Sequence, residues 1–204
     1  MTDLYIVRHG NTFDTGDIIT RVGARTDLAL SISGCAQAEA LAAHFSHIVP
    51  KGFSRAYCSP LLRTRQTAEI ILEKSAAAPA LETLEFLREV DYGPDENKPE
   101  AAVIARLGEA ALRAWETDAV PPPGWQINPD ALRTAWRDLF HFVSASSERL
   151  PVLIVTSNGI ARFLLSEITA FKTRPDSIKL KTGAYGIVRA LPGSTMLTAW
   201  NVRP

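Results

Sequence analysis

The stretch "VLIVTSNGIARFLL" (152–165) constrains the fold more than any other part of the chain. Five apolar or β-branched residues run straight into Ser-Asn-Gly, and a helical pattern follows at once. A short apolar run that ends in a strand-to-helix turn is typical of a buried strand in a parallel sheet. The backbone N–H groups of such a turn are free to bind an anion. The stretch therefore predicts an α/β fold in which Ser157 is either a helix cap or part of a ligand site.

The same alternation of strand and helix recurs along the chain. Short apolar runs at 4–9 and 55–59 predict two more strands, and helical patterns begin after Ser33 and Ser59, two residues that favour helix starts. Further helices are predicted over 99–116 and 129–143, and an antiparallel pair of strands over 185–191 and 196–202. The predicted fold class is α/β, a three-layer α/β/α arrangement with a mostly parallel, partly mixed central sheet.

The length of the chain predicts its domain organisation. At 204 residues it is long enough for one domain with a full core and short for two, so we expect a single domain over 1–204. Within it we expect a helical and loop cap region at about 90–130, because the proline-rich stretch "TDAVPPPGWQINP" has the length at which a surface loop is suspected as a lid.

Charge and cysteine content exclude several classes of protein. Twenty-two basic and 22 acidic residues give no net charge, which predicts no nucleic-acid partner and no attraction to an anionic membrane. No apolar run reaches the length of a membrane span and the first residues lack a basic leader, so we expect a cytoplasmic protein. Cys35 and Cys58 lack a C-x-x-C spacing, which argues against disulfides and zinc. We expect no metal and no cofactor.

Polar residues gather where three predicted strands end, in "RHGNT" (8–12), "CSPLLR" (58–63) and "TSNG" (156–159). Ligands of open α/β sheets bind at the carboxyl ends of the strands. An arginine, a histidine and a glycine in sequence offer a planar cation, a group that titrates near neutral pH and a backbone that an anion can approach closely. These ends predict an anion site.

The chain resembles the histidine phosphatase superfamily, which includes the cofactor-dependent phosphoglycerate mutases. The resemblance rests on five ordered blocks over residues 4–165: "LYIVRHGNT", "RVGARTDLALSISGCAQAEALA", "YCSPLLRTRQTAEII", "LREVDYG" and "VLIVTSNGIARFLL". It implies that His9 accepts the phosphoryl group, that Arg8 and Arg63 clamp the phosphate, and that Glu89 donates the proton. Phosphoryl transfer needs one nucleophile, cations over the phosphoryl oxygens and one acid, which these residues supply. The neighbouring Arg65 is an alternative to Arg63.

The resemblance implies further contacts around this group. Thr12 and Arg21 match positions at the substrate mouth, with Arg25 as the rival of Arg21. Ser157 and Asn158 are expected to bind the phosphate through the serine hydroxyl or the backbone just beyond it.

The chain departs from the family pattern at Ser157. Counting back from Arg162 places the family's second histidine at this serine, and His44, His47 and His141 lie in or beside predicted helices, where an ordinary structural role accounts for them. A second departure follows Glu89, where "GPDENKPEA" replaces a familiar substrate-binding sequence. We expect that segment and "AVPPPGW" to shape the mouth.

Three functions fit this pattern. The first is a phosphomonoesterase that forms a phosphohistidine on a small phosphorylated metabolite, with activity weakened because serine donates a neutral hydrogen bond where imidazolium would donate a charged one. The alternatives are a non-catalytic phospho-ligand binding protein and a phosphoglycerate mutase-type phosphotransferase. The binding protein would not need both His9 and Glu89, and the mutase would need further basic residues to hold a bisphosphate.

Overall fold

A seven-stranded mixed sheet forms the centre of the computed structural model, which describes residues 1–146 and 150–204. Strand β1 (Thr2–Arg8) lies in the middle, parallel to β4 (Val152–Thr156) on one side and antiparallel to β6 (Tyr185–Leu191) on the other. The sheet continues past β4 with the parallel strands β2 (Arg55–Cys58) and β3 (Leu81–Thr83), and past β6 with β7 (Ser194–Val202) and β5 (Ala170–Phe171). The parallel core and the antiparallel pair near the end of the chain are confirmed.

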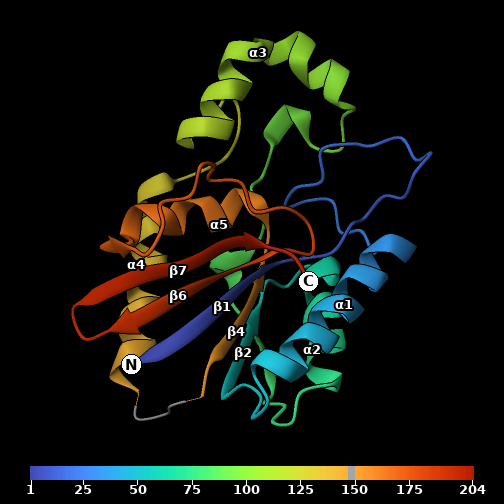
Figure 1. Cartoon of the computed structure of the whole chain (residues 1–204). Helices are drawn as coiled ribbons and strands as arrows, with labels where there is room; N and C mark the ends of the chain where they lie inside the picture. Colours follow the sequence, from blue (N-terminus) through green and yellow to red (C-terminus); the bar gives the residue numbers. More distant parts are fainter. Residues whose placement is uncertain (147–149) are drawn as a thin grey trace.

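Helices cover both faces of the sheet, as the predicted three-layer fold requires (Figure 1). Tyr5 and Val7 of β1 belong to one buried cluster, which includes residues of α1 (Ile32–Ile48) and α2 (Leu62–Glu73). The alternate residues Leu4 and Ile6 belong to a second cluster, which includes residues of α4 (Pro129–Ala145) and α5 (Asn158–Leu164). Because successive side chains of a strand point to opposite faces, the strands are apolar on both sides.

Carboxylates from distant parts of the chain set the starts of α1 and α2. Helix α1 begins at Ile32 with Ser31 as its N-cap, where the sequence pattern suggested Ser33, and the carboxylate of Asp14 accepts hydrogen bonds from the N–H groups of Ile32 and Ser33, both at 3.0 Å. Helix α2 begins at Leu62, whose N–H donates to Asp27 at 2.7 Å. These acceptors satisfy N–H groups that have no partner inside a helix.

Helix α3 (Glu100–Asp118) lies apart from the other helices, at one end of the molecule (Figure 1). Gly108, with φ of 77°, interrupts it at mid-length. The loop that follows is fastened by Trp125, whose indole N–H donates to Asp95 at 2.7 Å, and by a bridge between Asp91 and Gln126. The three-proline loop thus packs through its tryptophan against the segment after Glu89.

Three single turns of 3₁₀ helix complete the described elements, at Glu85–Leu87, Gly93–Asp95 and Leu165–Glu167. No helix in residues 1–146 and 150–204 is both long enough and apolar enough to cross a membrane.

Candidate active site

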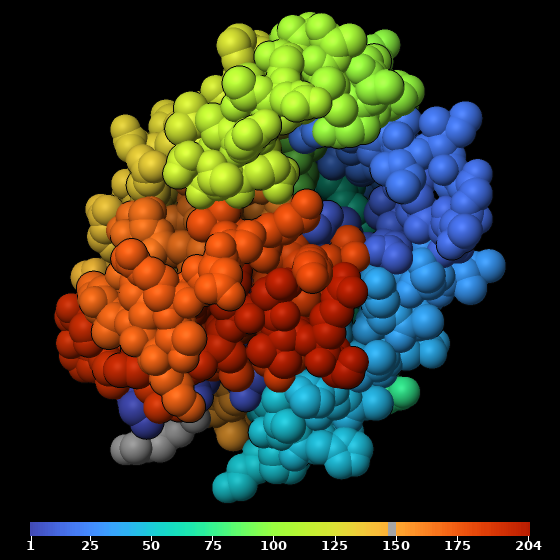
Figure 2. All heavy atoms as spheres, turned by 45° about the horizontal axis from the view of Figure 1, so that its top comes forward, coloured from blue at the N-terminus to red at the C-terminus, as the bar shows by residue number. Residues whose placement is uncertain are grey.

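A cavity of about 480 Å³ opens where β1 ends. Figure 2 shows it as a hollow between α3 and the loop that follows β1. Six of the residues singled out in the sequence line it: Arg8, His9, Thr12, Arg21, Glu89 and Asn158. They come from four separate parts of the chain, and the strand order brings them together.

His9 lies at the floor of the cavity and is only 6 % exposed. Its Nδ1–H donates to the carbonyl of Gly10 at 2.7 Å, which leaves the lone pair on Nε2. Burial first, and then the charges of Arg63 and Arg8, lower the pKa of His9 well below its usual value near 6.5. The imidazole is therefore uncharged at neutral pH, with Nε2 as an available nucleophile.

Arg63 lies beside His9 and is fully buried. Its Nε–H donates to Nε2 of His9 at 3.3 Å, while its two terminal nitrogens donate to the carbonyls of Thr26 at 2.9 Å and Gly23 at 3.2 Å. Burial lowers the pKa of this guanidinium, and the carboxylate of Glu89 opposes that effect. Arg65, the alternative two residues further along, is exposed. The structure thus places Arg63 and not Arg65 at the histidine.

Arg8 ends β1 and lines the cavity. One of its terminal nitrogens donates to the carbonyl of Leu180 at 2.9 Å, and its Nε is buried with no hydrogen-bond partner among the described residues. Burial lowers the pKa of Arg8, again opposed by Glu89. An unpaired buried donor is costly, so this nitrogen is suited to an anionic ligand in the cavity.

Glu89 is held by backbone N–H groups and is 6 % exposed. Oε1 accepts from the N–H of Val90 at 2.9 Å and Oε2 from the N–H of Gly159 at 3.4 Å. A side chain at position 159 would not fit, because a Cβ there would lie 2.2 Å from Oε1 of Glu89. The glycine after Ser157-Asn158 therefore makes room for the carboxylate.

Ser157 and Asn158 follow β4 directly. Ser157 is fully buried, and its Oγ has no hydrogen-bond partner among the described residues. The serine occupies the N-cap position of α5, but its side chain caps no N–H group there. Asn158 lines the cavity, and its Oδ1 accepts from the N–H of Leu180 at 2.8 Å, which leaves its amide nitrogen free to donate.

Arg21 lines the cavity and Arg25 does not. Arg21 donates to the carboxylate of Glu100 at 2.6 Å. Arg25 turns away, donating to Asp91 at 3.0 Å and to the carbonyl of Gly93 at 2.6 Å. Thr12, the other residue expected at the mouth, also lines the cavity.

The other histidines lie away from the cavity. His44 lies 2.8 Å from the hydroxyl of Tyr185, and His47 bonds to the carbonyl of Ala43 on its own helix at 2.7 Å. His141 is exposed on α4. None of them takes the position that Ser157 occupies.

Several residues that line the cavity were not predicted from the sequence. Tyr92, Trp115, Glu116 and Lys179 all line it. Residues 119–125, which were expected at the mouth, do not line it, and the segment 93–101 contributes only Glu100. Tyr92 belongs to the "LREVDYG" block and could have been found there, whereas nothing in the sequence around Lys179 marks it.

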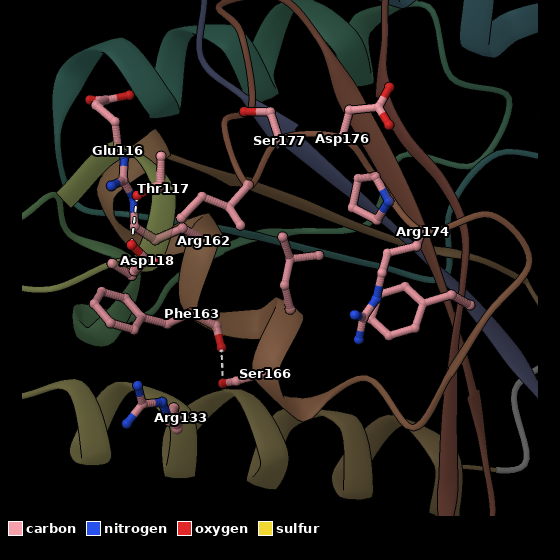
Figure 3. Close-up of a pocket in the computed structure, with 15 residues that line it drawn as sticks. Glu116, Thr117, Asp118, Arg133, Arg162, Phe163, Ser166, Arg174, Asp176 and Ser177 are labelled. Carbon is pink, nitrogen blue, oxygen red and sulfur yellow. Dashed lines mark hydrogen bonds between the residues drawn. The ribbon is translucent and has the colours of Figure 1, made fainter. Parts of the chain in front are cut away.

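A second cavity, of about 450 Å³, adjoins the first. Glu116 lines both cavities, and Figure 3 shows it at the edge of the second, across from Arg174. Between them Arg162 donates to the carbonyl of Trp115 and lies 3.9 Å from the centre of that ring. Arg162 thereby supports the wall that separates the two spaces.

The described part of the chain holds no cluster of three or more His, Cys, Asp or Glu side chains that could bind a metal ion. What the site does hold is an uncharged imidazole, two guanidinium groups and a carboxylate. Groups of these kinds can act as nucleophile, cations and proton carrier in phosphoryl transfer.

The curated relatives that match are phosphatases. The chain is 33 % identical over 142 residues to the fructose-2,6-bisphosphatase TIGAR of Mus musculus, and 34 % identical over 143 residues to that of Bos taurus. Each match covers 69 % of this chain and 50 % of the relative, so the chain spans about half the length of the curated relatives it matches.

Solved structures share the fold over the whole chain. A mycobacterial glucosyl-3-phosphoglycerate phosphatase superimposes with a TM-score of 0.79 at 20 % identity, covering 100 % of both chains. A putative alpha-ribazole-5'-P phosphatase from Escherichia coli K-12 gives a TM-score of 0.74 at 20 % identity, covering 99 % of this chain and 97 % of the other.

The family profile described as "Histidine phosphatase superfamily (branch 1)" matches residues 4–203, nearly the full length. Together with the five ordered sequence blocks and the fold, this match shows that the chain belongs to the histidine phosphatase superfamily.

Proposed function

We propose that this chain is a phosphomonoesterase that forms a phosphohistidine on His9 and acts on a small phosphorylated metabolite. The observation that carries the proposal is the state of His9: an uncharged ring whose Nε2 lone pair lies 3.3 Å from Arg63, at the floor of a cavity that Arg8 and Glu89 also line. A nucleophile, a cation and an acid that line one cavity, with the buried cation Arg63 in contact with the nucleophile, suit the transfer of a phosphoryl group.

The proposed reaction has two steps. In the first, Nε2 of His9 attacks the phosphorus, the bond from phosphorus to the ester oxygen breaks, and Glu89 in its protonated form gives that oxygen a proton. In the second, Glu89 as a carboxylate takes a proton from water, whose oxygen attacks the phosphohistidine. Inorganic phosphate leaves, and both side chains return to their starting state.

The remaining residues hold the phosphate in this scheme. Arg8 and Arg63 neutralise the oxygens that gain charge in the transition state, and the unpaired Nε of Arg8 supports this role. The unpaired hydroxyl of Ser157 and the free amide of Asn158 donate further hydrogen bonds to the phosphate. Thr12 and Arg21 contact the part of the substrate beyond the phosphate.

We expect turnover to be slow for this family. In our interpretation Ser157 stands where the family has a second histidine, and a neutral hydroxyl replaces a charged donor. The loss of one preorganised donor in a comparable site costs roughly a hundredfold in rate. The same replacement is what favours the alternative, a protein that binds a phosphorylated ligand without turning it over.

A chemical trap for the phosphohistidine tests the proposal. The protein would be mixed with p-nitrophenyl phosphate or with a panel of natural monoesters and quenched without acid, and peptides would be searched by mass spectrometry for phosphate on His9. His9→Ala should abolish both phosphate release and the modified peptide. His141→Ala, a histidine exposed on α4, serves as the matched control.

Two results would contradict the proposal. Undiminished release of phosphate by His9→Ala would remove the nucleophile from the scheme. Tight binding of phosphate esters with no release by the unsubstituted chain would favour the binding protein.

A further inference from the structure

The charges that line the candidate active site balance one another. Among the described residues three cations line the cavity, namely Arg8, Arg21 and Lys179, and three carboxylates, namely Glu89, Glu100 and Glu116. Two of the cations are paired with carboxylates at the mouth. Arg8 is the one lining cation without a carboxylate within ion-pair distance, and the proposed reaction uses it for the transferred phosphate.

The first pair, Arg21 and Glu100, is in close contact. One terminal nitrogen of Arg21 lies 2.6 Å from both carboxylate oxygens. The guanidinium also lies over the rings of Tyr92, at 5.3 Å, and Trp125, at 5.0 Å, and the arginine side chain is only 13 % exposed. Arg21 is therefore held by a carboxylate and two aromatic faces before any ligand arrives.

The second pair, Lys179 and Glu116, marks the border with the neighbouring cavity. The ammonium lies 3.5 Å from the carboxylate, and both side chains are about half exposed. Glu116 lines both cavities, and Figure 3 shows it at the edge of the neighbouring one. A ligand that extends from His9 toward this border meets an ion pair whose two charges cancel. The ligand would contact the carboxylate oxygens of Glu116 as well as the ammonium of Lys179.

A second phosphate group would bind weakly at a mouth with these two ion pairs. It would have to displace a carboxylate from its cation or lie next to a carboxylate, and like charges in contact oppose binding. Hydroxyl groups fit better, because carboxylate oxygens accept their hydrogen bonds. The same cavity carries the side chains of Asn11, Thr20 and Thr182, whose polar groups can exchange hydrogen bonds with hydroxyls.

We infer that the mouth selects a phosphate monoester whose remaining part is rich in hydroxyls and carries no second phosphate. Glu100 and Glu116 are the residues that determine this specificity, since each masks a cation that would otherwise attract a second phosphate. The inference rests on the proposed function, because it takes the phosphate at His9 as given.

Competition measurements test the inference without requiring that the competitor be turned over. Glucose 6-phosphate and fructose 6-phosphate would each be compared with the corresponding 1,6-bisphosphate as inhibitors of p-nitrophenyl phosphate hydrolysis. In the unsubstituted protein we expect each monophosphate to have an inhibition constant on the order of tenfold lower than its bisphosphate.

Neutral variants of the two carboxylates sharpen the test. Glu100→Gln and Glu116→Gln keep the size of the side chain and unmask Arg21 and Lys179, so each should shift the ratio of inhibition constants toward the bisphosphate by about fivefold, the value of one ion contact in water. Glu109→Gln is the matched control, because Glu109 lies on the same helix, pairs at 3.8 Å with the exposed Arg113 and does not line the cavity. Its ratio should equal that of the unsubstituted protein.

The outcomes separate this inference from the function on which it rests. Tighter binding of the bisphosphates by the unsubstituted protein, or ratios unchanged in both Glu100→Gln and Glu116→Gln, would overturn the specificity assignment while leaving phosphatase activity in place. Hydrolysis of p-nitrophenyl phosphate that survives in His9→Ala would instead overturn the proposed function.

Discussion

The Nε of Arg63 lies 3.3 Å from Nε2 of His9, in the fully buried layer beneath the cavity. The arginine has no acceptor capacity, so the imidazole nitrogen must carry the lone pair. A proton on Nε2 would bring two cations into contact. This contact therefore keeps the histidine uncharged, with its lone pair on Nε2, and holds a cation beside it.

Arg63→Lys tests how much of this arrangement depends on the guanidinium. Lysine keeps a charge but cannot donate at once to His9, Thr26 and Gly23, so kcat/KM for p-nitrophenyl phosphate should fall by about 10² to 10³-fold. The matched substitution Arg65→Lys changes an exposed arginine two residues away and should alter kcat/KM by less than about twofold. Equal losses in both variants would mean that Arg63 has no special part.

The low pKa of His9 predicts how stability depends on pH. An unfolded histidine takes up a proton near pH 6.5, while folded His9 stays neutral well below that value. The folded state therefore binds fewer protons, and the free energy of unfolding falls as the pH drops below about 6.5, by up to about 1.4 kcal/mol per pH unit. The variant His9→Asn should lack this contribution to the pH dependence of the free energy of unfolding.

Urea unfolding of the two proteins at pH 7.5, 6.5 and 5.5 measures that component. The other histidines are common to both proteins and cancel in the difference. The stability of the unsubstituted protein relative to His9→Asn should decrease by about 0.4 kcal/mol from pH 7.5 to 6.5 and by about 1 kcal/mol more from pH 6.5 to 5.5. A difference that does not change with pH would mean that folded His9 titrates normally.

Glu89→Gln should affect substrates according to their leaving groups. Glutamine cannot protonate the ester oxygen, so hydrolysis of an alkyl phosphate such as glycerol phosphate should slow by about 10² to 10⁴-fold. The nitrophenolate ion leaves readily without a proton, so p-nitrophenyl phosphate should lose much less in the first step, which a burst measurement isolates. Glu85→Gln, on an exposed neighbouring turn, is the control. A uniform loss for both substrates would argue against proton donation by Glu89.

Substitution of Ser157 should affect the stability of the protein and its activity differently. The buried hydroxyl of Ser157 has no hydrogen-bond partner in residues 1–146 and 150–204, so Ser157→Ala should leave the melting temperature unchanged or raise it, while kcat/KM falls about tenfold or more if the hydroxyl contacts phosphate. Thr156→Val is a contrasting variant, because Thr156 Oγ1 donates to the carbonyl of Leu87 at 2.9 Å and its loss should cost about 1 kcal/mol of stability. Ser157→Ala with full activity would show that the serine takes no part.

Ser157→His tests the same position in the other direction. If this serine replaces a charged donor, restoring one should raise turnover by about one to two orders of magnitude. Circular dichroism and phosphate binding would confirm that the variant stays folded with its site intact. No gain in a folded, phosphate-binding variant would contradict the proposed equivalence.

The strands and the central residues of the site were predictable because their signals are local. Apolar runs that end in Arg-His-Gly and in Ser-Asn-Gly identify buried strands and the edge at which ligands bind, and that edge holds His9 in the structure. The three-layer arrangement followed from the same alternation. The short strands β3 and β5, of three and two residues, carry too few residues to show a period, and both were missed.

Features that depend on distant parts of the chain were not predictable. The starts of α1 and α2 depend on Asp14 and Asp27, which lie 18 and 35 residues before the N–H groups they accept from. The choice between Arg21 and Arg25 was decided by Glu100, Asp91 and Gly93, all more than 60 residues away. Lys179 enters the cavity from a segment with no motif. Such contacts leave no periodic pattern in the sequence.

The central place of β1 in the sheet has a consequence for how the protein is made. This strand leaves the ribosome before its two neighbours, β4 and β6, which are synthesised about 150 and 185 residues later. Until then an apolar segment with both edges open has no native partner, which slows folding and exposes the nascent chain to association with others. Arg8 likewise cannot donate its hydrogen bond to the carbonyl of Leu180 until that residue has been synthesised. The end of the sheet that lines the cavity is thus assembled only after β6 has emerged.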